Sequence, residues 1–168
     1  MGTQHNIPPS FQKIARNDGI FLEKIHDTCQ LQTKLKEPTV CPSCSAVFHE
    51  ERCQWLEASA NSHQHNCPAC QRIHDHFPAG LVTLTGDFTY SHHEEIMNLI
   101  DNLEKEEQAE HPLGRVMAIE KTGDGILITT TDIHLVRGIG ETVHNAYQGD
   151  LEYHYNPGEM LLRVYWVR

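Results

Sequence analysis

The chain has 168 residues and carries 13 Lys and Arg against 23 Asp and Glu, a net charge of −10 with neutral histidines. This length is enough for one ordinary domain and a small additional module. No apolar run approaches the ~20 residues that a membrane-spanning helix needs, and the first residues lack the basic and apolar pattern of a secretory signal. We therefore expect a cytoplasmic protein with reduced thiols and no membrane segment.

Residues 1–38 contain scattered apolar side chains, but these follow no sustained helical or strand period. This pattern predicts an arm that is partly disordered or that becomes ordered only on a partner or against the main domain.

Two cysteine pairs follow the arm, each with proline after its first cysteine. The pairs are Cys41-Pro-Ser-Cys44 and Cys67-Pro-Ala-Cys70, and 22 residues separate them. A Cys-x-x-Cys turn points two sulfurs to one side of a tight loop, and two such loops facing each other supply the four thiolates of a closed zinc site. The spacing predicts one structural zinc ion with no ligand position left for catalysis.

Two other readings of the cysteine pairs stay open, a pair of redox dithiols and an iron site of rubredoxin type. A redox dithiol typically opens a helix beside a βαβ pattern, whereas here a proline in each loop argues against a helix and both pairs recur in one local segment. Cys29 and Cys53 are left over, and we interpret them as bystanders.

The pairs lie in a predicted zinc module of residues 39–80. Residues 47–56, between the pairs, form either the hairpin arm of a zinc ribbon or a short helix. Phe48 and Trp55 are expected to cover the small core around the metal, because so short a module has little else to shield it.

Residues 81–168 carry the clearest secondary-structure signals. A β-branched and aromatic run predicts a strand over 81–90, with Gly86 as the candidate position for a bulge, and Ser91 begins a capping box before a helix that runs to about Glu110. Thr131 or Asp132 is expected to cap a second helix, whose apolar residues between Ile133 and Tyr147 follow the helical period. The remaining predicted elements are a hairpin of strands 115–121 and 126–130 joined by Asp-Gly, and a terminal hairpin of strands 151–155 and 160–167.

The resulting order, β-α-β-β-α-β with an extra terminal strand, predicts an α+β protein with a ferredoxin-like split βαβ domain after the zinc ribbon. Both helices would cover one face of the sheet, and the other face would be open to a partner, to the zinc module or to a second copy in a homodimer. Four aromatic residues of the terminal strands are core residues or, alternatively, a base-stacking surface: Tyr153, Tyr155, Tyr165 and Trp166.

Charge is distributed unevenly along the chain. Residues 81–168 hold 15 acidic and 6 basic residues, so this half would repel a polyphosphate, whereas residues 1–80 hold 8 acidic and 7 basic residues. Any nucleic-acid contact is therefore expected in the first half, at Lys34, Lys36, Arg52 and Arg72. The alternative is that these four are ordinary solvated surface charges.

Asp132 and His134 beside Thr131 resemble a base next to a hydroxyl nucleophile, but neighbouring residues at a strand-to-helix junction need only be caps. The chain has no phosphate-binding Gly-rich loop, no GxSxG and no HExxH. We therefore expect a protein that is not an enzyme.

The segment from about residue 37 to 168 resembles a small bacterial zinc-ribbon family labelled NMD-type, "affecting ribosome stability and mRNA decay". The resemblance rests on CPSC and CPAC, Pro-Ala-Gly at 78–80, Glu-His-Pro-Leu at 110–113, Thr-Thr-Asp-Ile-His-Leu at 130–135, Ile-Gly at 139–140 and Leu-Arg-Val-Tyr-Trp at 162–166. It implies distant similarity to the amino-terminal part of the archaeal and eukaryotic adaptor of the large ribosomal subunit, although this chain has only two cysteine pairs. The expected function is a non-enzymatic zinc-binding factor that associates with the ribosome or RNA; the alternative is a zinc-stabilised protein-interaction adaptor that binds no nucleic acid.

Overall fold

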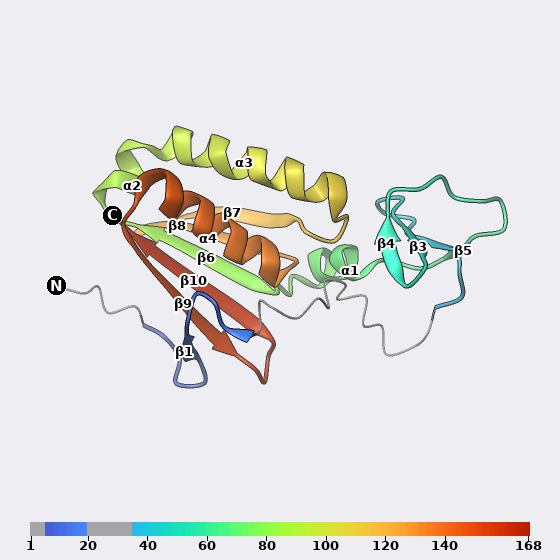
Figure 1. Cartoon of the computed structure of the whole chain (residues 1–168), viewed down its shortest axis with the longest axis horizontal. Helices are drawn as coiled ribbons and strands as arrows, with labels where there is room; N and C mark the ends of the chain where they lie inside the picture. The colour runs from blue at the N-terminus through green and yellow to red at the C-terminus, as the bar shows by residue number, and fades with distance from the viewer. Residues whose placement is uncertain (1–5, 20–34) are drawn as a thin grey trace.

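The computed structural model describes residues 6–19 and 35–168 and contains two units, an α+β domain on a six-stranded sheet and a small module with a four-stranded sheet. Figure 1 shows the module at one end of an elongated molecule, next to the end of the long helix α3 (His93–Glu110). The expected α+β class and the four-cysteine cluster are confirmed. Among the described helices, none is long and apolar enough to cross a bilayer.

The large sheet has the strand order β1-β9-β10-β6-β8-β7, and every neighbouring pair is antiparallel except β10 and β6. The sequence correctly predicted both hairpins of this sheet, because the Asp-Gly turn and the alternating apolar residues of the terminal strands are strong local signals. The strands are β1 (Gln12–Ile14), β6 (Gly80–Thr85), β7 (Val116–Thr122), β8 (Gly125–Thr130), β9 (Asp150–Asn156) and β10 (Leu161–Val167).

The predicted ferredoxin-like arrangement is not confirmed, because the extra strand β10 lies inside the sheet. In a four-stranded split βαβ sheet, the strand that follows the second helix borders the first strand. Here β10 separates β9 from β6 and runs parallel to β6. Burial favours this place: Leu162, Val164 and Trp166 on one face of β10 have no exposed surface, and a central strand covered by the helices buries such a face completely.

The chain leaves β6 earlier than its β-branched sequence suggests. Gly86 has a φ of 99°, and a Cβ at this position would lie 2.1 Å from the carbonyl oxygen of Arg168. The chain turns there into α2 (Asp87–Ser91), so the predicted strand over 81–90 is wrong beyond Thr85. The predicted cap at Ser91 is wrong too, since its hydroxyl donates to the carbonyl of Asp87 within α2 and α3 begins after His92 without a side-chain cap.

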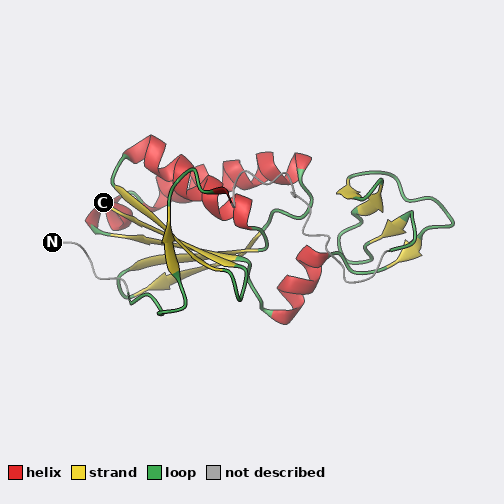
Figure 2. Ribbon diagram, turned by 60° about the horizontal axis from the view of Figure 1, so that its bottom comes forward, coloured by secondary structure: helices red, strands yellow, loops and turns green. Residues whose placement is uncertain are grey.

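Helices α2, α3 and α4 (Ile133–Tyr147) lie on one face of the large sheet (Figure 2). Asp132 precedes α4 at the N-cap position, but its side chain makes no capping hydrogen bond. Gly140 on α4 permits close packing on the sheet, because a Cβ there would lie 2.7 Å from a methyl carbon of Val164.

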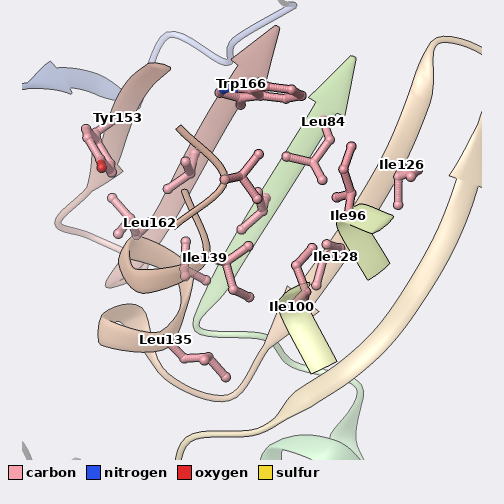
Figure 3. Close-up of a cluster of buried hydrophobic side chains, with 14 residues drawn as sticks. Leu84, Ile96, Ile100, Ile126, Ile128, Leu135, Ile139, Tyr153, Leu162 and Trp166 are labelled. Carbon is pink, nitrogen blue, oxygen red and sulfur yellow. The ribbon is translucent and has the colours of Figure 1, made fainter. Parts of the chain in front are cut away.

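The core lies between these helices and the sheet (Figure 3). Trp166 is completely buried, and its indole N–H donates to the carbonyl of Gln148 over 2.6 Å. The other fully buried large side chains come from α3, α4 and the central strands: Val82, Leu84, Ile96, Ile100, Ile126, Ile128, Leu135, Val136, Ile139, Val143 and Leu162.

Part of the predicted arm is ordered against the α+β domain. β1 adds an edge strand to β9, with Ile14 opposite Tyr153. Phe11 is buried, and the guanidinium of Arg163 lies over its ring at 4.7 Å from the centroid. Residues 1–5 and 20–34 of the predicted arm lie outside the described residues.

Candidate metal centre

The first cysteine pair lies in the turn between the first two strands of the small sheet. This sheet has the order β4-β3-β2-β5 and consists of β2 (Thr39–Val40), β3 (Val47–His49), β4 (Arg52–Gln54) and β5 (His63–Gln64). The N–H of Ser45 donates to the carbonyl of Cys41 over 2.8 Å, and Ser45 has a φ of 67°. This left-handed residue closes the loop so that Cys41 and Cys44 face the same side.

The second pair opens a helix rather than a second tight loop, which differs from the two facing loops that we expected. Cys67 is the N-cap of α1 (Pro68–Asp75), and Pro68 occupies the first helical position, where its fixed φ suits the helix and its missing N–H costs nothing. The N–H of Cys70 donates to the sulfur of Cys67 over 3.4 Å. The proline that we read as a mark against a helix is therefore part of the helix start.

All four sulfurs lie within 4.8 Å of one another, and Cys41, Cys44, Cys67 and Cys70 form the sole group of three or more candidate metal ligands among the described residues. The sulfurs of Cys44 and Cys67 are 3.7 Å apart. Four sulfurs at the usual zinc–sulfur distance around a tetrahedral ion would be ~3.8 Å apart. Because the two pairs converge on one point, the arrangement suits a single metal ion better than two independent dithiols.

The thiols of this cluster have pKa values shifted in opposite directions. Burial opposes ionisation of Cys41, but backbone N–H donors from Cys67, Cys44 and Ser43 outweigh it and lower the pKa of Cys41 to about 6. Burial raises the pKa of Cys67 and of Cys70 above the ordinary value. Four clustered thiolates repel one another, and a bound cation removes that repulsion, so metal binding would be coupled to release of protons.

An arginine of the α+β domain, which the sequence gave no reason to select, completes the surroundings of the cysteines. Nη1 of Arg115 donates to the sulfur of Cys70 over 3.3 Å, and its Nε donates to the carbonyl of Pro112 over 2.8 Å. Arg115 is 9% exposed. Burial by itself would lower its pKa, but hydrogen bonds to the cysteine sulfurs and their charge raise it above the ordinary arginine value.

The α+β domain also supplies an apolar contact to the metal centre. Leu113 is buried against the cysteines, in a cluster that includes Cys53 but is distinct from the main core. Phe48 packs against this cluster as expected, whereas Trp55 is 41% exposed and donates from its indole N–H to the carbonyl of Gln108 on α3 over 2.7 Å. Trp55 therefore links the module to the domain instead of covering the metal.

The predicted nucleic-acid contacts do not gather into one basic patch among the described residues. Arg52 is exposed on β4 next to Glu50 and Glu51. Arg72 is partly buried on α1 and donates to the carbonyl of Phe77 over 3.2 Å. Lys36 is exposed at the start of the module.

Lys34 lies outside the described residues, as does Cys29.

The four aromatic residues considered for base stacking belong mostly to the interior. Tyr153, Tyr165 and Trp166 are buried, and Tyr155 is half-buried against the main core. None of the three buried rings is free to stack on a nucleotide in this structure.

The hydroxyl of Thr131, beside Asp132, makes hydrogen bonds to the backbone of the 111–115 turn. The hydroxyl of Thr131 donates to the carbonyl of Leu113 and accepts from the N–H of Arg115 over 3.0 Å. Burial raises the pKa of Asp132, although the charge of His134 opposes this shift. Thr131 thereby fixes the turn that carries Leu113 and Arg115 to the cysteines.

Comparison of the chain with protein-family models, with curated proteins and with solved structures gives no match. The relation to the NMD-type family, and the ribosome association that it implies, stay predictions.

Proposed function

We propose that this protein is a non-enzymatic zinc-binding adaptor, in which one zinc ion bound by Cys41, Cys44, Cys67 and Cys70 fixes the small module to the α+β domain. The convergence of four sulfurs, two of them buried, carries this proposal. A closed four-thiolate site is typical of structural zinc. An iron ion would accept the same ligands, so the metal content of the purified protein decides between the two.

The ion would act on the joint between the two units as well as on the module. Arg115 offers a positive charge to the sulfurs, and a zinc ion with four thiolates carries a net negative charge that this guanidinium offsets. Because Arg115 and Leu113 belong to the α+β domain, loss of the ion would weaken the contacts that these two residues make with the module. The proposed role of zinc is therefore to hold one surface together from two parts of the chain.

A protein partner is favoured over RNA by the charges. The chain carries a net charge of −10, and Arg52 and Arg72, the best candidate phosphate contacts, are separated on different elements with different surroundings. Binding to a polyphosphate needs several clustered cations. Association with the ribosome remains compatible with this proposal where the contact is to a basic ribosomal protein.

Sedimentation of the native protein from lysate, with and without nuclease, tests the adaptor proposal. We expect the native protein to sediment in a complex that survives nuclease. The Cys44→Ser variant should not sediment in this complex, because it lacks one metal ligand. Cys53→Ser is the matched control, since Cys53 is buried in the same module but is not one of the four clustered sulfurs. Loss of all association after nuclease, or full association of a zinc-free Cys44→Ser protein, would contradict the proposal.

A further inference from the structure

A groove of about 1240 Å³ lies where the module meets the α+β domain. Its walls come from three places: the β3–β4 hairpin of the module, the last turn of α3 with the loop that follows, and the start of α4. Figure 1 shows these three parts near one another at the joint between the units. The groove therefore exists only while the module is docked.

The walls of this groove are acidic. Six carboxylate residues line it, against two arginines, Arg52 and Arg137. One carboxylate, Glu141, is already paired with Arg16. The remaining five are Glu50, Glu51, Glu107, Glu110 and Asp132.

Four of these five are glutamates on the module hairpin and near the end of α3. Glu50, Glu51 and Glu110 are exposed, and Glu107 is half-buried. Within residues 6–19 and 35–168, none of the four takes part in an ion pair. Like charges on facing walls repel one another, and a cation placed between them relieves that repulsion.

An aromatic ring is fixed in the same groove. Trp55 lines it with 41% of its surface exposed, and the hydrogen bond from its indole N–H to the carbonyl of Gln108 restricts the orientation of the ring. A tryptophan face attracts lysine and arginine side chains, and a ring that is already held in place loses little freedom on binding. This observation is independent of the carboxylates and indicates the same kind of ligand.

We propose that this groove binds a lysine- and arginine-rich segment of a partner protein, with basic side chains between the glutamates of the hairpin and of α3 and with Trp55 as the aromatic contact. This inference rests on the adaptor function proposed above and names the chemistry of its partner. A volume of about 1240 Å³ accommodates several residues of a peptide. The same carboxylates would repel phosphate groups, so we do not expect nucleic acid to bind in this groove.

Fluorescence anisotropy with a labelled peptide of alternating arginine and glycine tests the groove in the zinc-loaded, full-length protein. Glu107→Gln with Glu110→Gln removes two charges from the groove. We expect binding about tenfold weaker at low salt, since each exposed charge pair contributes about threefold. The matched control is Glu94→Gln with Glu95→Gln, which changes the net charge equally at the other end of α3, ~20 Å away by the helical rise.

The control pair should change peptide affinity by less than about twofold, and all variants should keep the zinc content and melting temperature of the parent. An equal loss from both pairs would overturn the proposal, because the peptide would then follow overall charge alone. Absence of peptide binding, or tighter binding of a labelled single-stranded RNA, would overturn it as well. A nuclease-resistant partner complex that persists under any of these results would leave the adaptor function standing and remove only the groove assignment.

Discussion

Arg115 lies next to the cysteine sulfurs although it is 45 residues from Cys70 in sequence. Replacing it with methionine keeps most of the side-chain volume and removes the charge that faces the thiolates. We expect Arg115→Met to weaken zinc binding 10- to 100-fold, the usual effect of losing a group that supports metal ligands. Competition with a chromophoric chelator measures this affinity. Arg52→Met, at an exposed arginine of the zinc module, should leave this affinity unchanged. Equal zinc affinities of both variants would contradict the role given to Arg115.

The difference between the cysteines and Arg115 shows what a sequence reveals at the scale of residues. Cys41, Cys44, Cys67 and Cys70 were predictable because a short fixed spacing brings each pair together before any tertiary structure forms. Arg115 carries no such local signal. Its position depends on how the 111–115 turn packs against the module, which is decided by Leu113 and by the hydrogen bonds of Thr131.

Strand β1 is attached to the α+β domain by two carboxylates whose pKa values are lowered. Burial raises the pKa of Glu141, but the hydrogen bond and charge of Arg16 outweigh burial; a hydrogen bond from Lys13 lowers the pKa of Glu152. A carboxylate with a lowered folded-state pKa stabilises the fold above its unfolded-state pKa, near 4.3 for glutamate, and loses this effect as the pH falls through the lowered value. The attachment of β1 should therefore weaken from about pH 5 downwards.

Hydrogen exchange of the amides of residues 12–14, corrected for the intrinsic rate at each pH, measures that attachment. We expect their protection to fall between about pH 5 and about pH 3 while the amides of the central strand β6 stay protected. Arg16→Met should reduce the protection already at neutral pH. Protection of β1 that is constant down to pH 3 would show that its backbone pairing with β9 suffices without these ion pairs.

Elements were predictable where a local signal agrees with the tertiary structure. The hairpin of β7 and β8 follows from Asp124-Gly125, and α4 follows from its apolar period. Strand β6 ends at a turn in which Gly86 lies against the carbonyl of Arg168, a contact with the far end of the chain that no local pattern indicates. The central place of β10 also depends on non-local packing, since a terminal hairpin has the same sequence pattern whether it lies at the edge or in the middle of a sheet.

At the scale of the molecule, the two units have separate buried interiors. The cysteine cluster with Leu113 is distinct from the core around Trp166. They meet through a few contacts, chiefly those of Arg115, Leu113 and Trp55. The charge asymmetry was visible in the sequence, but the groove was not, because its glutamates come from segments whose relative placement depends on this docking.

Because the two units have separate interiors, removal of the metal should unfold the module and leave the α+β domain folded. Because metal binding is coupled to the folding of a small module, chelation should unfold the module, while the α+β domain keeps a core that contains no cysteine of the cluster. In a Trp55→Phe variant, the one remaining tryptophan, Trp166, reports on that core alone. We expect its emission to stay at the wavelength of a buried indole after chelation, while residues 39–78 become sensitive to protease. A red shift of Trp166 on zinc removal would instead mean that the ion stabilises both units as one cooperative structure.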